Sequence, residues 1–158
     1  MTRLPLRLGA RAATLALAAC ACWVAVAAPP PDSTQFPYAG FQASCAPWDG
    51  PAIVIAISRS PVECGEHRVY ELNVSLWKDL PPHAGQTISL GSASNKGHAS
   101  YCAGAGKQCE IAATGTVQFE LFKSGKLAQG TYDFTFPKAG RLKGGFRAQW
   151  CASRVFCG

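Results

Sequence analysis

Apolar and polar residues alternate with a period of two along much of the chain after residue 50. The stretch 69–77 is the clearest early example, because Leu72, Val74 and Leu76 share one face with polar residues between them. Such alternation is typical of strands that bury one face, and no segment after residue 44 holds apolar residues at helical spacing over three turns. The sequence therefore predicts an all-β domain. Further strands are expected at 53–58 and 87–90, with a long loop at 91–106.

The C-terminal third predicts a three-stranded antiparallel meander, with turns at 123–126 and 137–141. Strands of this number and spacing favour a small antiparallel sandwich or an open barrel. The residues expected to face inward are Val117, Phe119 and Leu121 on the first strand, Tyr132, Phe134 and Phe136 on the second, and Leu142, Phe146, Ala148 and Trp150 on the third.

The register of the meander follows from the requirement that inward residues lie opposite inward residues. A short first turn and a five-residue second loop both satisfy this requirement, whereas a second loop one residue shorter would place Phe136 opposite Arg141. The predicted registers pair Leu121 with Ala128, Phe136 with Leu142, and Phe134 with Gly144.

Two stretches of the predicted meander resemble a known type of ending. Gly130-Thr131-Tyr132-Asp133-Phe134-Thr135-Phe136 and Gly145-Phe146-Arg147-Ala148-Gln149-Trp150-Cys151 are similar to the endings of small, uncharacterised exported or lipoprotein β-domains of bacteria. The shared pattern is G-x-F-x-A-x-W-C. The resemblance implies an antiparallel meander closed by a cysteine, and it carries no catalytic residue.

The N-terminal segment has the order of a secretory signal. The first eleven residues carry three arginines and no acid, and an apolar run follows at 12–28 before three consecutive prolines. Cleavage after Ala27 would release an exported protein into the periplasm or the medium. Cleavage before Cys20 would instead give an outer-membrane lipoprotein, because Leu17-Ala18-Ala19-Cys20 is similar to a lipidation box. An uncleaved membrane anchor is the third alternative.

The number of cysteines favours cleavage after Ala27. That cut leaves an even set that can close three disulfides, whereas lipidation of Cys20 would leave Cys22 as an unpaired seventh cysteine. Cysteines of an exported domain are normally structural. The six predicted disulfide cysteines are Cys45, Cys64, Cys102, Cys109, Cys151 and Cys157.

One disulfide can be predicted from the spacing alone. Cys102 and Cys109 flank a short glycine-rich loop that can double back, so we expect them to bond. A strand between Cys45 and Cys64 would hold these two apart, so either could bond to one of the two cysteines near the C-terminus. The segment 64–67 has the spacing of half a zinc site, but no second pair matches it, and we expect neither a metal nor a cofactor.

Proline positions set the expected boundaries of the domain. Residues 1–27 form the predicted signal peptide. Residues 28–44 contain four prolines and predict a linker, because proline prevents a helix there. The predicted single β domain, stabilised by its disulfides, then spans residues 45–158.

Basic residues concentrate at the C-terminal end of the chain. The formal charge is +6 overall, but residues 121–158 hold seven basic residues against Asp133 alone, whereas residues 28–120 hold five against eight acids. Such a surface could attract an anionic glycan or lipid. The competing interpretation is ordinary cross-strand pairing of Asp133 with Lys143 and Arg147. The candidate binding residues are Lys143 and Arg147, expected on the outward face, and Lys123, Lys126, Lys138 and Arg141, expected in turns.

The sequence predicts an exported binding or structural protein whose extracytoplasmic partner it does not name. A recognition module or inhibitor acting through the loop between Cys102 and Cys109, with His98, Tyr101 and Lys107, is the main alternative. A small hydrolase is a weaker alternative, because the three histidines show no triad and no paired carboxylates occur. Nucleic acid is disfavoured, since basic residues are not interleaved with exposed aromatics. We expect a monomer that contacts a membrane only if it is lipidated at Cys20.

Overall fold

Residues 35–64, 70–104, 107–153 and 155–157 are described by the structure, a computed structural model. This part of the chain contains strands and no helix, which confirms the prediction of an all-β domain. The strands are β1 (Tyr38–Cys45), β2 (Pro51–Ser58), β3 (Leu72–Leu76), β4 (Thr87–Gly91), β5 (Gly97–Tyr101), β6 (Glu110–Ile111), β7 (Thr114–Lys123), β8 (Leu127–Phe136) and β9 (Gly140–Trp150).

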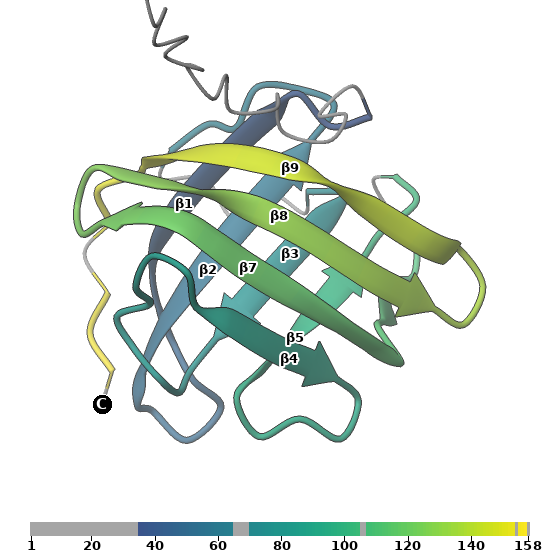
Figure 1. Cartoon of the computed structure of the whole chain (residues 1–158), viewed down its shortest axis with the longest axis horizontal. Coiled ribbons are helices and arrows are strands. Elements are labelled where there is room, and N and C mark those ends of the chain that lie inside the picture. Colours follow the sequence, from purple (N-terminus) through teal and green to yellow (C-terminus); the bar gives the residue numbers. More distant parts are fainter. Residues whose placement is uncertain (1–34, 65–69, 105–106, 154, 158) are drawn as a thin grey trace, which may run out of the picture.

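The strands form one sheet that curves into a nearly closed barrel, in the order β4-β7-β8-β9-β1-β2-β3-β5-β6. In Figure 1 the strands β4, β7, β8 and β9 form a front layer, and they cross over a back layer of β1, β2, β3 and β5. Neighbours are antiparallel except β1 and β9, which run parallel and pair Gly40 with Gln149 and Phe41 with Trp150. This parallel pairing joins the two layers along one side.

The chain between β6 and β7 joins the layers on the other side. The backbone N–H of Ala112 donates to the carbonyl of Ala99 in β5, and the N–H of Ala113 donates to the carbonyl of Thr135 in β8, both at 2.9 Å. These two adjacent residues therefore hydrogen-bond to both layers, and the barrel is almost closed.

Large apolar side chains fill the interior of the barrel. Phe41, Phe119, Phe134 and Phe136 are all buried to 2% exposure or less. Each ring gains about 1.5 to 3 kcal/mol from leaving water. Because side chains pack the interior, the candidate binding surfaces lie on the outside of the barrel. The aliphatic residues packed with these rings include Ile55, Ile57, Leu72, Val74, Leu76, Ile88 and Val117.

The first hairpin of the meander departs from the predicted register after Phe119. The pairing is as expected up to Phe119 opposite Gly130, but a β-bulge follows, and Phe122 takes the position opposite Ala128 that was predicted for Leu121. The bulge turns the Phe122 ring toward Phe41 and Phe119, at centroid distances of 5.5 and 6.0 Å. The pairing of Leu121 with Ala128 is therefore wrong, because one extra residue fits into the bulged strand.

The second hairpin is shifted by two residues from the prediction. Phe136 pairs with Gly140 and not with Leu142, so the turn is shorter than the predicted loop at 137–141. A positive φ of 74° at Gly140 permits this tight turn. The ring over Gly144 is that of Tyr132, where a Cβ would lie 2.7 Å from the Tyr132 hydroxyl oxygen. A shift of two leaves the faces unchanged, so the predicted inward residues of β9 are still buried or packed against the core.

The back layer holds two strands that were not predicted. β1 begins within the predicted linker 28–44 and ends at Cys45, and β5 lies within the predicted loop 91–106. The linker boundary is thus wrong, because β1 pairs with β2 along its full length, from Tyr38 opposite Ser58 to Cys45 opposite Pro51. The predicted signal peptide at 1–27 and its alternative lipidation site, Cys20, lie outside the described residues.

The three disulfides connect Cys45 with Cys157, Cys64 with Cys151, and Cys102 with Cys109. The predicted bond of Cys102 with Cys109 is confirmed, as is the expectation that Cys45 and Cys64 bond to the C-terminal cysteines. Two of the bonds tie the back layer to the chain after β9. Among the described residues, no helix is long and apolar enough to cross a membrane.

Candidate functional site

Most of the predicted basic residues follow β9 on the outside of the front layer, whereas Lys123 ends β7, two strands away. Arg141, Lys143 and Arg147 are exposed positions of β9 that alternate with buried residues. Lys138 lies in the turn before β9, and the backbone N–H of Trp150 donates to the carbonyl of Lys126 at 3.0 Å. This bond places the β7–β8 turn beside the end of β9 (Figure 1). The basic row, as we call it, consists of Lys138, Arg141, Lys143, Arg147, Lys126 and Lys123.

The spacing of the basic row follows from strand geometry. Outward residues of one strand repeat every two positions, or roughly 6.6 Å, and the eleven residues of β9 span roughly 36 Å. The row therefore runs from the β8–β9 turn to the β7–β8 turn, the full length of the front layer. It is a linear arrangement and does not converge on one point.

Arg141 is the member of the row that is most clearly paired. Its guanidinium donates to both carboxylate oxygens of Asp133, at 2.7 and 2.5 Å. The hydrogen bond from Arg141 lowers the pKa of Asp133, and the charges of Arg141 and Lys143 act in the same direction. The predicted placement of Arg141 in a turn is wrong, because the shorter turn brings it into β9.

Arg147 and Lys143 do not form the predicted ion pairs with Asp133 either. Arg147 donates to the side-chain oxygen of Gln129 at 3.2 Å, and Gln129 donates to Glu120 at 3.0 Å. Lys143 lies directly opposite Asp133 across the β8–β9 pair. Within the described part of the chain, no salt bridge joins Lys143 or the lysines of the two turns to an acid.

The two layers carry different charge. Residues 114–150 hold the six basic residues of the row and two acids, Glu120 and Asp133. The other described residues hold four basic residues and five acids. The charge asymmetry along the sequence is thus also an asymmetry between the layers of the barrel.

A groove at one end of the barrel lies between the loop from Cys102 to Cys109 and the β8–β9 turn, which were predicted as parts of two separate sites. It has a volume of about 650 Å³ and is lined by Tyr101, Lys107 and Lys138, among others. The Glu110 carboxylate accepts the backbone N–H groups of Lys138 and Ala139, at 2.8 and 2.9 Å, and so holds the β8–β9 turn against the disulfide loop. Of the residues proposed for that loop, His98 lies elsewhere, beside the Trp77 ring.

A second groove, which sequence reasoning missed, lies beside the Arg141 end of the basic row. Its volume is about 740 Å³, and it crosses the outer face of β4, β7 and β8. Its floor is rich in hydroxyl groups, which can donate and accept hydrogen bonds. The only signal in the sequence is that polar positions of these strands are mostly serine or threonine. The residues of this hydroxyl groove are Ser89, Ser94, Thr114, Thr116 and Thr135, with Asp133 and Arg141 at its edge.

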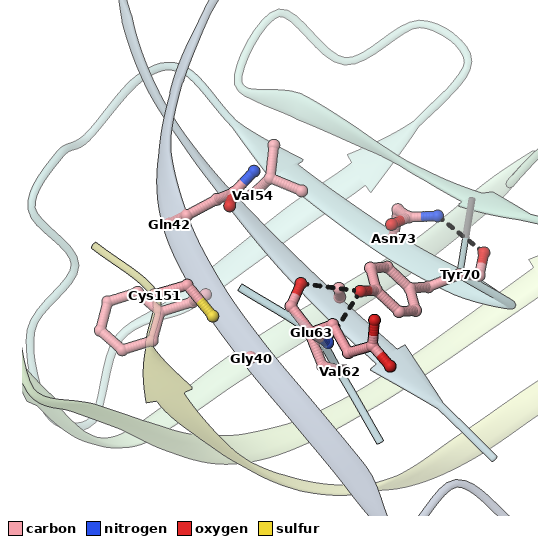
Figure 2. Close-up of a pocket in the computed structure, with 10 residues that line it drawn as sticks. Gly40, Gln42, Val54, Val62, Glu63, Tyr70, Asn73 and Cys151 are labelled. Carbon is pink, nitrogen blue, oxygen red and sulfur yellow. Dashed lines mark hydrogen bonds between the residues drawn. The ribbon is translucent and has the colours of Figure 1, made fainter. Parts of the chain in front are cut away.

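The small pocket in Figure 2 is a packing feature of the back layer. It lies over β1, β2 and β3, and its volume is about 110 Å³. The Tyr70 hydroxyl accepts the backbone N–H of Glu63 at 3.0 Å and donates to its carbonyl at 3.1 Å. Gly40 makes room for Val62, since a Cβ there would lie 2.8 Å from that side chain. These bonds hold the chain before Cys64 against the sheet.

The residues considered for catalysis do not form a cluster in the described part of the chain. His83 is exposed, and His98 is half-buried, which lowers its pKa below the usual 6.5. His67 lies outside the described residues, and Cys64 is bonded to Cys151. No group of three His, Cys, Asp or Glu side chains that could hold a metal ion occurs among the described residues.

Comparisons with protein-family models, curated proteins and solved structures found no match to this chain.

Proposed function

We propose that this domain works outside the cytoplasm as a binding protein for an acidic glycan, which it contacts through the basic row. The carrying observation is the line of cationic side chains along β9. The three disulfides are consistent with an oxidising, extracytoplasmic compartment. Export itself is part of the proposal, and it rests on the signal-like N-terminal segment.

A linear polymer suits the basic row better than a compact anion does. On β9, Arg141 and Lys143 are roughly 6.6 Å apart and Lys143 and Arg147 roughly 13 Å apart, so each can meet a separate acidic group of an extended chain. Each exposed contact contributes only about 0.2 to 1 kcal/mol, so useful affinity requires several contacts made together. Such binding weakens as salt rises, because salt screens exposed charges.

A glycan is favoured over a lipid by the hydroxyl groove beside the row. Ser89, Thr114 and Thr116 offer groups that match the hydroxyls of sugars, and the groove meets the row at Arg141. An acyl chain would bind weakly to this groove, because it cannot hydrogen-bond to the hydroxyl groups. The proposed ligand is therefore an acidic polysaccharide that lies on the outer face of the front layer.

The test is binding to heparin, used as a sulfated polysaccharide probe, at several salt concentrations. We expect Lys143→Gln/Arg147→Gln to weaken binding about tenfold at low salt, as two lost contacts would. The matched control is Lys78→Gln/Lys96→Gln, which removes the same charge from the back layer and should change affinity less than about twofold. Equal losses in both variants would mean that net charge alone drives binding. Absence of binding at low salt would end the proposal.

A further inference from the structure

Three aromatic rings from separate segments meet on the outside of the barrel. Trp48 lies in the turn between β1 and β2, Trp77 follows β3 directly, and His98 lies on β5. The ring centroids of Trp48 and Trp77 are 5.6 Å apart, and those of Trp77 and His98 are 5.1 Å apart. We call these three rings the aromatic ledge. It belongs to the back layer and contains no residue of the basic row.

The ledge is fixed by hydrogen bonds and by close packing. The indole N–H of Trp77 donates to the carbonyl of Asn95 at 2.9 Å, and its backbone N–H donates to the carbonyl of Lys96 at 3.0 Å. Gly50 leaves room for the Trp48 indole, because a Cβ at this glycine would lie 2.7 Å from the indole nitrogen. A ligand that meets rings already held in place loses little conformational entropy on their account.

Trp48 is exposed to an extent that core packing does not explain. Trp48 as a residue is 56% exposed, whereas Phe41, Phe119 and Phe134 are all buried. A large ring held on the surface is typical of binding sites, where aromatic residues carry much of the affinity. The fold does not require this ring to be outside, so its exposure points to a partner that contacts it.

Charged residues of both signs are close to the ledge along the chain, and the carbonyl of Lys96 accepts the backbone N–H of Trp77. Lys96 and Asp79 form an ion pair at 2.8 Å, with 46% and 44% of their side chains exposed. Asp49 follows Trp48 directly in the turn. A purely apolar partner would bury these groups without partners, at a cost in free energy. A polyanion would be repelled by Asp49, and Lys96 is already paired with Asp79.

We infer that the aromatic ledge binds a pyranose ring of a neutral glycan. A pyranose has an apolar C–H face that can stack on the Trp48 indole, and a rim of hydroxyls that can hydrogen-bond to Asp49 and to the Lys96–Asp79 pair. This combination of one flat apolar contact and several hydrogen bonds matches what the ledge presents. The site is independent of the acidic-glycan surface, which lies in the other layer and needs no aromatic ring.

The test is titration of the folded, disulfide-bonded protein with three neutral probes: chitotetraose, cellotetraose and maltotetraose. We expect at least one to bind and to change the tryptophan fluorescence. Trp48→Ala should weaken that binding about tenfold or more, as loss of one stacked ring would. Its melting temperature should stay near that of the unchanged protein, because the ring is exposed. Tyr38→Ala is the matched control, since Tyr38 is also exposed, at 44%, but lies at the other end of β1.

Two outcomes would overturn the inference. One is that none of the three probes binds. The other is that Trp48→Ala binds the probe as well as the unchanged protein does.

The two proposals fail separately. Lys143→Gln/Arg147→Gln should keep full affinity for the neutral probe, and added salt should not weaken it. If the unchanged protein binds the tetrasaccharide but not heparin, the basic row is excluded as a binding surface and the ledge stands. The reverse result would remove the ledge alone.

Discussion

The two layers of the barrel are built by different means. The front layer has its three longest strands, β7, β8 and β9, joined by tight turns, and its rings pack in a continuous series from Tyr132 to Phe136. The back layer has shorter strands, and disulfides at Cys45 and Cys64 tie it to the C-terminal end of the chain. Local alternation thus organises one half of the domain, and covalent bonds between distant residues secure the other.

The layers also differ in what they present to solvent. The front layer carries the basic row and the hydroxyl groove, whereas the back layer is close to neutral and carries the aromatic ledge. One fold can therefore offer two surfaces of different chemistry, because strand alternation leaves every outward side chain free to vary without disturbing the core.

Removing a disulfide tests the dependence of the back layer on covalent bonds and should have the largest effect. Cys64→Ala/Cys151→Ala removes a disulfide between residues that are 87 positions apart in the sequence. Cys102→Ala/Cys109→Ala removes a disulfide between residues that are 7 positions apart. In the chain-entropy model the first loss costs about 3.5 kcal/mol of unfolding free energy, because the remaining bond of Cys45 with Cys157 shortens the loop that it closes, and the second costs about 2.5 kcal/mol. Urea unfolding measures both. A larger loss from the short-range bond would contradict a dependence of the back layer on its long-range bonds.

Removing a ring tests the dependence of the front layer on its core. Phe134 is fully buried, and we expect Phe134→Ala to lower the free energy of unfolding by about 4 kcal/mol. The neighbouring outward residue gives the control, since Thr135→Ala should change it by less than about 0.5 kcal/mol. If urea unfolding gave similar losses of unfolding free energy for Phe134→Ala and Thr135→Ala, the stability of the front layer would not depend on its inward face.

The smallest expected effect is a difference between the layers in how the free energy of unfolding depends on pH. Burial lowers the pKa of His98 below 6.5, so the unfolded chain takes up this proton first, and stability falls as pH drops below 6.5. The pKa of Asp133 is lowered below 3.8, so its contribution is present above that pH and is lost only in stronger acid.

Thermal unfolding across this pH range gives the measurement. In His98→Phe, the melting temperature should depend less on pH just below pH 6.5. The loss of stability in stronger acid, which is due to Asp133, should be unchanged. An unchanged slope in His98→Phe would remove His98 from this explanation.

The front layer could be predicted because most of its inward positions hold large apolar residues that alternate with polar ones. The register of the second hairpin could not, since a shift of two residues leaves the pattern of Phe134, Phe136 and Leu142 on the same face. The positive φ at Gly140, which decides the turn, has no unique signature in the sequence.

The back layer was harder to predict, because its inward positions are often small. β5 has Gly97 and Ala99 at buried positions, and β1 has Phe41 as its one large buried residue. Such strands lack the contrast that reveals alternation. The aromatic ledge was missed for another reason: Trp48, Trp77 and His98 are far apart in the sequence and meet only when β1, β3 and β5 are assembled.

The most direct test of the central claim is a map of backbone amide chemical shifts during titration with a heparin oligosaccharide at low salt. We predict changes along β9 at Lys143 and Arg147 and in the turns that contain Lys126 and Lys138, with the pocket over β1, β2 and β3 unaffected. Changes confined to the back layer, or spread evenly over both layers, would contradict the assignment of the basic row as the binding surface.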